Sequence, residues 1–120
     1  MSSKTIVITG ASRGLGRAMA EGFLDLDHTV IGCSRASTGP DLGENFHYHS
    51  VDIASPSDVE TFAQRVLNDH GAADLLINNA ALINENAPLW EVSDKEFTSL
   101  LDVNLRGIAN TVRSFVPAMI

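Results

Sequence analysis

The sequence predicts an α/β fold in which about four parallel strands form a doubly wound sheet with flanking helices. Short runs of strand-like composition lie at residues 5–9, 30–33, 46–51 and 75–77, and segments with helical spacing separate most of them. Strands that are apolar on both faces are typical of parallel sheets covered by helices on both sides. Right-handed crossovers between such strands complete the predicted topology.

The first predicted helix begins near Gly14, directly after the first strand. Apolar and small residues recur in it at helical spacing, which predicts one apolar face. The residues expected on that face are Leu15, Ala18, Met19, Gly22 and Leu26.

Two further helices carry start and stop signals. Ser55 is predicted to be an N-cap, with Pro56 at the first helical position, and Gly71 ends this helix. A capping box that starts at Ser93 opens a long apolar helix reaching Met119. The chain is therefore predicted to end in a helix packed on the sheet.

Composition excludes several classes of protein. The 120 residues are 44% apolar and carry a net charge of −7, which disfavours nucleic acid and anionic membranes as partners. The single cysteine, Cys33, lies in a predicted strand and is expected to be a buried core residue. No apolar run approaches the length of a membrane span, and no secretory signal precedes the first strand. We therefore expect a cytoplasmic protein.

The fourth strand bears on domain organisation. At residues 75–77 it is apolar throughout, and with the predicted elements alone it forms an exposed edge, which proteins usually avoid. We therefore expect residues 1–120 to be the N-terminal half of a longer protein. The alternative is a self-contained small domain ending at Ile120.

A glycine-rich turn lies between the first strand and the first helix. Such turns direct backbone N–H groups and the positive end of a helix at one point, which suits a phosphate group. The glycines also permit a tight turn and a close approach of the backbone to a pyrophosphate. The expected cofactor-binding residues of this turn are Gly10, Ser12, Arg13, Gly14, Leu15 and Gly16.

The turn, of the form T-G-x-x-x-G-x-G from Thr9 to Gly16, resembles that of the short-chain dehydrogenase/reductase family. The sequence N-N-A-A at residues 78–81 resembles the family's N-N-A-G, and D-V-N-L at residues 102–105 resembles a further motif. The resemblance covers essentially the whole chain. It implies the N-terminal half of a Rossmann-like fold that binds NAD(H) or NADP(H).

The end of the second strand predicts which dinucleotide is bound. In such folds an acidic residue there favours NAD, whereas an arginine accommodates the 2′-phosphate of NADP. The strand ends in Cys33-Ser34-Arg35, and no acidic residue follows before Asp41. Arg13 lies on the adjacent turn, so two guanidinium groups are available to one phosphate. The predicted cofactor is NADP(H).

The resemblance assigns roles to residues that follow the third and fourth strands. Asp52 and Ile53 are expected to contact the adenine ring, although Asp52 also reads as an ordinary loop residue ahead of a helix. Asn79 and Ala80 are expected beside the cofactor ribose, and Asn78 is assigned a mainly structural role. Ala81 departs from the family's glycine and reduces the space beside the backbone.

Asn104 is the one catalytic candidate in the chain. Its spacing places a polar amide on the apolar face of the long helix, where it needs hydrogen-bond partners. It is either a satisfied core asparagine or, as the resemblance implies, part of the Ser-Tyr-Lys catalytic group through a water and a bent helix. The family's Tyr-x-x-x-Lys is not found in these residues, because Tyr48 is followed four positions later by Asp52. The 120 residues alone are therefore expected to be inactive.

The resemblance extends to activity. The segments at residues 28–35 and 84–93 resemble NADPH-dependent pterin aldehyde reductases of the family. This resemblance implies that the protein reduces an aldehyde or ketone. It also implies that Trp90 and residues 84–90 lie near the entrance of the substrate site. The alternative for Trp90 is packing against the long helix. The long helix is expected to form a dimer or tetramer interface, and no metal is expected. A 3-oxoacyl reductase and a non-catalytic dinucleotide-binding module are the alternative functions.

Overall fold

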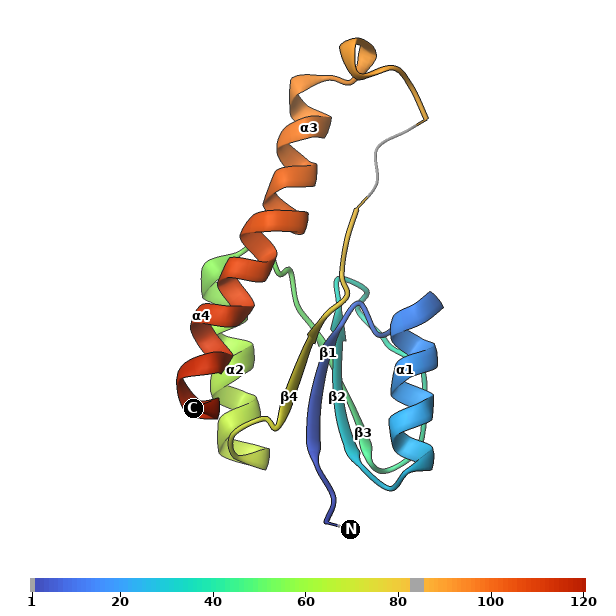
Figure 1. Ribbon diagram of the computed structural model, residues 1–120, viewed down its shortest axis with the longest axis vertical. Helices are drawn as coiled ribbons and strands as arrows, with labels where there is room; N and C mark the ends of the chain where they lie inside the picture. Colours follow the sequence, from blue (N-terminus) through green and yellow to red (C-terminus); the bar gives the residue numbers. More distant parts are fainter. Residues whose placement is uncertain (1, 83–85) are drawn as a thin grey trace.

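The structure is a computed structural model, which describes residues 2–82 and 86–120. Four parallel strands form one sheet in the order β3-β2-β1-β4 (Figure 1). In chain order the elements are β1 (Thr5–Thr9), α1 (Gly14–Asp25), β2 (Thr29–Ser34), β3 (Phe46–Ser50), α2 (Pro56–His70), β4 (Leu75–Asn78), the short 3-10 helix η1 (Leu89–Glu91), α3 (Asp94–Leu101), the π-helical segment η2 (Asp102–Arg106) and α4 (Gly107–Met119). The predicted α/β class and parallel sheet are confirmed.

Helices cover both faces of the sheet, with α1 on one side and α2 and α4 on the other (Figure 1). Along β1, Ile6 and Ile8 belong to the apolar cluster on the α1 side, whereas Val7 belongs to the cluster on the α2 and α4 side. All three side chains are at most 2% exposed. This alternation follows from the two-residue period of a strand and explains why β1 is apolar at every position.

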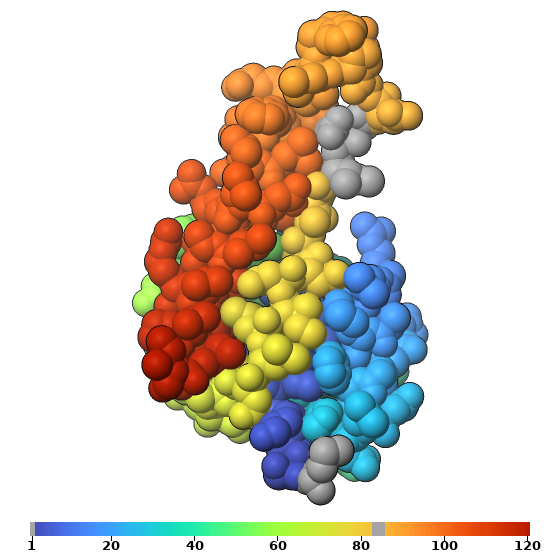
Figure 2. All heavy atoms as spheres, in the orientation of Figure 1, coloured from blue at the N-terminus to red at the C-terminus, as the bar shows by residue number. Residues whose placement is uncertain are grey.

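β4 occupies an edge of the sheet, as the sequence predicted. Leu75 is 42% exposed even though it lies in an apolar strand. Figure 2 shows β4, in yellow, open at the surface between α1 and α4. On its other side β4 forms parallel pairing with β1, from Ile6 to Thr9.

The face of α1 that packs on the sheet differs from the predicted one. Leu15 and Leu26 are 69% and 60% exposed, whereas the buried residues of α1 are Gly16 and Ala20. At Gly16 the helix approaches the glycine turn too closely for a side chain, and Phe23 and Leu24 pack against the core further along the helix. The prediction for this helix face was therefore wrong, although Met19 packs against the core as expected.

The capping predictions are confirmed. The Ser55 hydroxyl accepts a hydrogen bond from the Asp58 N–H at 3.3 Å, and the Ser93 hydroxyl accepts one from the Glu96 N–H at 3.1 Å. From Ser93 the chain continues as one helix through α3, η2 and α4, and α3 extends beyond the sheet (Figure 1). No helix of residues 2–82 and 86–120 has the length and apolar character to cross a membrane.

A cluster of histidines lies between β3 and α2. The ring centroids of His47 and His70 are 4.6 Å apart, and the ring of His49 lies 5.1 Å from that of Phe62. Burial lowers the pKa of His49, and the positive charges of Arg65, His47 and His70 lower it further against the opposing effect of Asp69. Burial also lowers the pKa of His70, with a further contribution from His47, again opposed by Asp69.

We predict that this cluster makes stability fall as the pH is lowered. Both histidines bind protons more weakly in the folded state than in the unfolded state, whose pKa is about 6.5. Stability is therefore complete above about pH 6.5 and is lost as the pH falls toward the folded-state pKa values. The melting temperature of wild type should drop between pH 7.5 and pH 5.5, and the double variant His49→Phe/His70→Gln should show a smaller drop. An equal drop in both proteins contradicts this origin.

Candidate functional site

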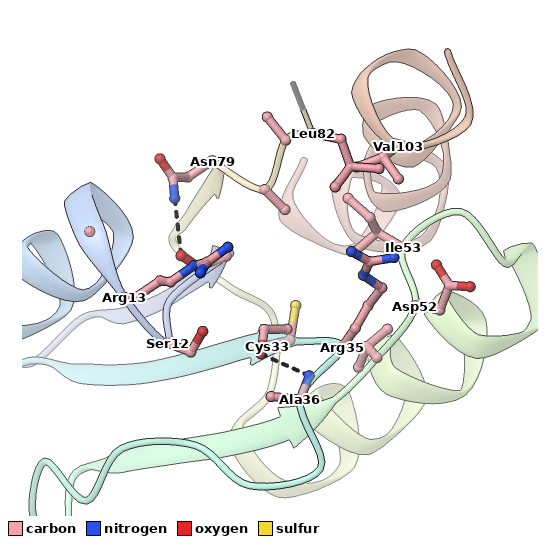
Figure 3. Close-up of a pocket in the computed structure, with 16 residues that line it drawn as sticks. Ser12, Arg13, Cys33, Arg35, Ala36, Asp52, Ile53, Asn79, Leu82 and Val103 are labelled. Atoms are coloured by element: carbon pink, nitrogen blue, oxygen red, sulfur yellow. Dashed lines mark hydrogen bonds between the residues drawn. The ribbon is translucent and has the colours of Figure 1, made fainter. Parts of the chain in front are cut away.

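A cavity of about 510 Å³ opens where the carboxyl ends of β1, β2 and β4 meet (Figure 3). It gathers nine of the predicted site residues: Gly10, Ser12, Arg13, Gly14, Arg35, Asp52, Ile53, Asn79 and Ala80. Leu15, Gly16 and Asn104 do not line it. Residues not predicted as site residues complete the lining: Cys33, Ser34, Ala36, Val51, Ala81, Leu82 and Val103. Most of these additional residues are neighbours in the chain of a predicted site residue, and this position is the only feature of the sequence that indicates them.

The turn after β1 depends on glycine at two positions. Gly10 has a φ of +70° and Gly14 a φ of +60°, in the left-handed region that side chains disfavour. The N–H groups of Gly10 and Ala11 donate to the Cys33 carbonyl at 2.8 and 3.3 Å. These bonds hold the start of the turn on the end of β2, while a Cβ added to Gly14 would meet no other atom within 4 Å. The turn is thus anchored at one end and open at the other.

Gly16 has a different role, because it allows two backbone segments to touch. A Cβ added there would lie 2.0 Å from the Gly10 carbonyl oxygen and 2.6 Å from Asn79 Nδ2. Asn79 Nδ2 itself donates to the Gly10 carbonyl at 3.1 Å. The first turn of α1, the glycine turn and the segment after β4 therefore converge on one point, although Gly16 does not face the cavity.

The N-terminus of α1 has no side-chain cap. Arg13 occupies the N-cap position and its side chain caps no backbone group, and the first turn contains no acidic residue. In α2 and α3, by contrast, serine hydroxyls cap the first turn. Uncapped N–H groups at a positive helix end are suited to an anion such as phosphate.

Arg13 and Arg35 line the same cavity from two elements (Figure 3). Arg13 comes from the turn after β1, and Arg35 follows the last residue of β2. Both are exposed, and neither pairs with a carboxylate of residues 2–82 or 86–120. Two unpaired guanidinium groups beside one cavity favour a ligand with a further negative charge.

Asp52 and Ile53 form the part of the cavity nearest the long helix. The Asp52 carboxylate accepts from the Ala54 N–H at 3.0 Å, so it orders its own loop while remaining exposed. Ile53 is 6% exposed, and its carbonyl accepts from the buried amide of Asn110 at 2.8 Å. A Cβ on Gly107 would lie 2.7 Å from Ile53 Cδ1, so a larger residue there would require the Ile53 side chain to shift.

The segment after β4 is held by a side chain of β1. The hydroxyl of Thr9 accepts from the N–H groups of both Asn79 and Ala80 at 3.0 Å. The side-chain oxygen of Asn78 accepts from the buried hydroxyl of Thr111 at 2.5 Å, which ties β4 to α4. Local sequence patterns do not reveal the roles of Thr9 and Thr111, because their partners lie about 70 and 33 residues away.

Both polar atoms of the Asn104 amide form a hydrogen bond to one residue. Its Oδ1 accepts from the Leu82 N–H and its Nδ2 donates to the Leu82 carbonyl, both at 2.8 Å. The expected need for partners on the apolar face is therefore met by the chain after β4. Asn104 lies in the π-helical segment η2, and widened turns of this kind are frequent at functional sites. Its catalytic role stays a prediction.

The predicted substrate loop is only partly described. Asn84 lies outside the described residues, and so do its two neighbours in the chain. Trp90 is 85% exposed in η1, so it does not pack against the long helix as the alternative interpretation required. Its placement at a substrate mouth stays a prediction.

Cys33 is fully buried, as predicted, and burial raises the pKa of its thiol to about 12, so it is not a nucleophile at neutral pH. Within the described part of the chain, no three His, Cys, Asp or Glu side chains are grouped in a way that could hold a metal ion. The chemistry of the cavity is thus that of backbone amides, arginines and asparagine.

Known proteins share this architecture. A family model described as short chain dehydrogenase matches residues 4–120. An NADPH-dependent pterin aldehyde reductase from Arabidopsis thaliana is 37% identical over 127 residues, covering 100% of this chain and 52% of that protein. A 3-ketoacyl-(acyl-carrier-protein) reductase from Brucella melitensis complexed with NADH superposes with a TM-score of 0.92 at 28% identity, covering 96% of this chain and 50% of its own. An alcohol dehydrogenase from Thermococcus sibiricus complexed with 5-hydroxy-NADP superposes with a TM-score of 0.90 at 30% identity. The match covers 98% of this chain and 54% of that one. The chain thus spans about half the length of these relatives.

We predict opposite effects for two glycine-to-alanine changes in α1. Gly16→Ala forces apart the Gly10 carbonyl and the helix, and it should destabilise the protein by about 1–3 kcal/mol and weaken dinucleotide binding. Gly22→Ala is the matched control, because its Cβ meets nothing within 4 Å and it should stabilise the helix by roughly 0.5–1 kcal/mol. Thermal unfolding and fluorescence titration measure both effects. Equal behaviour of the two variants contradicts the close approach at Gly16.

Proposed function

Because the chain belongs to the short-chain dehydrogenase family, we propose that it forms the NADP(H)-binding part of an enzyme that reduces an aldehyde or ketone. The observation that carries this proposal is the pair of unpaired arginines beside the phosphate-binding turn. The proposed substrate class is that of the pterin aldehyde reductase relative.

The shape of the cavity fits a dinucleotide. The left-handed glycines and the uncapped first turn of α1 present N–H groups to a pyrophosphate. The close approach at Gly16 supports this arrangement, because a larger side chain would push the helix away from the turn. Ile53 supplies an apolar surface for the adenine ring, and Asn79 and Ala80 border the ribose in this proposal.

The preference for NADP(H) rests on Arg13 and Arg35. A hydrogen bond to a charged group contributes about 1.5–3 kcal/mol, so each arginine provides roughly a tenfold preference or more for the 2′-phosphate. No carboxylate competes for either side chain within residues 2–82 and 86–120. The relatives are divided on this point, since one is named as NADPH-dependent and another was crystallised with NADH.

The chain's own residues position the cofactor in this proposal. When bound, the nicotinamide supplies the hydride for reduction of the carbonyl carbon. Asn104 supports the proton relay, and a tyrosine outside these 120 residues donates the proton to the carbonyl oxygen. The proposed setting is the cytoplasm, and the proposed assembly is a dimer or tetramer through the long helix, where Phe97 of α3 and Leu105 of η2 are exposed.

A 3-oxoacyl reductase is the second candidate, because the structure from Brucella melitensis is of that class. NADPH oxidation by the full-length protein distinguishes the two. The proposal predicts faster turnover with a pterin aldehyde or simple aldehydes than with 3-oxoacyl thioesters. The reverse order favours the second candidate. Cofactor binding without turnover of either substrate favours a non-catalytic dinucleotide-binding module.

The cofactor preference gives a direct prediction. Arg35→Asp removes one guanidinium and places a carboxylate beside the 2′-phosphate, so the Kd for NADPH should rise by about 10- to 100-fold. The Kd for NADH should change by less than about threefold, because a carboxylate there accepts from the ribose hydroxyls. Fluorescence titration with each cofactor measures both values.

Arg65→Asp is the control for net charge, because Arg65 is exposed on α2 and does not line the cavity. This variant should alter the two Kd values equally and only slightly. Equal losses for NADPH and NADH in Arg35→Asp would refute the assignment of Arg35.

A further inference from the structure

The short segment that carries Arg35 is held by the neighbouring strand β3 and the residue after it. Three consecutive carbonyls accept hydrogen bonds from that side. The Ser34 carbonyl accepts from the Val51 N–H at 2.8 Å, and the Arg35 carbonyl accepts from the Ser50 hydroxyl at 3.4 Å. The Ala36 carbonyl accepts from the Tyr48 hydroxyl at 2.6 Å. These hydrogen bonds fix the backbone around Arg35, whereas the Arg35 side chain is exposed.

The Tyr48 hydroxyl belongs to a closed ring of three hydrogen bonds. Two carbonyls lie within its reach, that of Ser34 at 3.4 Å and that of Ala36 at 2.6 Å, and its single proton goes to the nearer one, Ala36. The Ser34 hydroxyl therefore donates to Tyr48 Oη, at 2.5 Å, and accepts from the Ala36 N–H at 3.3 Å. Each of the three groups donates once and accepts once. This ring fixes the backbone on both sides of Arg35.

The ring of Tyr48 also supports the loop that follows. A Cβ on Gly39 would lie 2.3 Å from Tyr48 Cγ, so the loop backbone lies directly on the aromatic ring. Phenylalanine would make this packing contact equally well. The hydroxyl is therefore needed for the hydrogen bonds to residues 34 and 36 and not for the core.

We propose that Tyr48 is a positioning residue for the 2′-phosphate, because its hydroxyl holds the backbone that presents Arg35 to the cavity. This role rests on the proposed function, in which Arg35 binds that phosphate. A guanidinium on a fixed backbone loses less conformational freedom when it binds a ligand than one on a mobile loop. Loss of the Tyr48 hydroxyl therefore weakens NADPH and spares NADH, which carries an uncharged hydroxyl instead of a phosphate at this position.

The test is a double-variant cycle on the full-length protein, with Tyr48→Phe, Arg35→Gln and their combination. Tyr48→Phe should raise the Kd for NADPH by about 3- to 10-fold, the size of one hydrogen bond, and leave the Kd for NADH within about twofold. In the Arg35→Gln background, Tyr48→Phe should change the Kd for NADPH by less than about twofold, because it acts through Arg35. The melting temperature reports any general loss of structure.

Ser99→Ala is the matched control, because it also removes a hydroxyl that donates to a backbone carbonyl, here within α3. It should leave both Kd values unchanged. If Tyr48→Phe weakens NADPH and NADH equally, or if its full effect persists without Arg35, the positioning role is overturned while the cofactor preference stands. If wild type binds both cofactors equally, the proposed preference is itself wrong and this role fails with it.

Discussion

The structure depends on the contact between the first turn of α1 and the backbone of the turn that precedes it. At Gly16 this approach leaves no room for a side chain, since a Cβ would lie 2.0 Å from the Gly10 carbonyl oxygen. The same carbonyl accepts from Asn79, so the segment after β4 is joined to the same point. The helix also begins here without a side-chain cap, so no side chain occupies the N–H groups of its first turn. The steric constraint at Gly16 thus fixes the corner of the fold at which an uncapped helix N-terminus, a feature suited to an anion, is located.

The opposite side of the cavity is fixed by hydrogen bonds. β3 and the following residue hold the carbonyls of residues 34–36, and Asn110 of α4 holds the Ile53 carbonyl. Asn110 is 3% exposed, and its Oδ1 has no hydrogen-bond partner among the described residues, so the bond to Ile53 is kept although the other half of the amide is unsatisfied. The backbone is fixed around the cavity, whereas the guanidinium groups of Arg13 and Arg35 pair with no carboxylate of the described residues. This combination suits selective recognition of a charged ligand.

Features that depend on neighbours in the chain were predictable from the sequence. The caps at Ser55 and Ser93, the apolar β1 and the glycine turn each follow from local rules, and together they predict the parallel sheet and most of the cavity. The exposed position of Leu15 was not predictable, because it depends on how closely α1 approaches the turn. Tyr48 and Leu82 were missed as partners because their hydrogen bonds cross 12 and 22 residues of chain. In a parallel sheet such contacts are set by strand order, which periodicity does not specify.

The most direct test of the central claim is a crystal structure of the full-length protein with NADPH. The account predicts the pyrophosphate on the first-turn N–H groups of α1 and the 2′-phosphate within hydrogen-bond distance of the Arg35 guanidinium, with Arg13 on its other side. It also predicts that residues 34–36 keep their hydrogen bonds to β3. A 2′-phosphate that faces solvent, with both arginines turned away, would contradict the claim that this cavity recognises NADP(H).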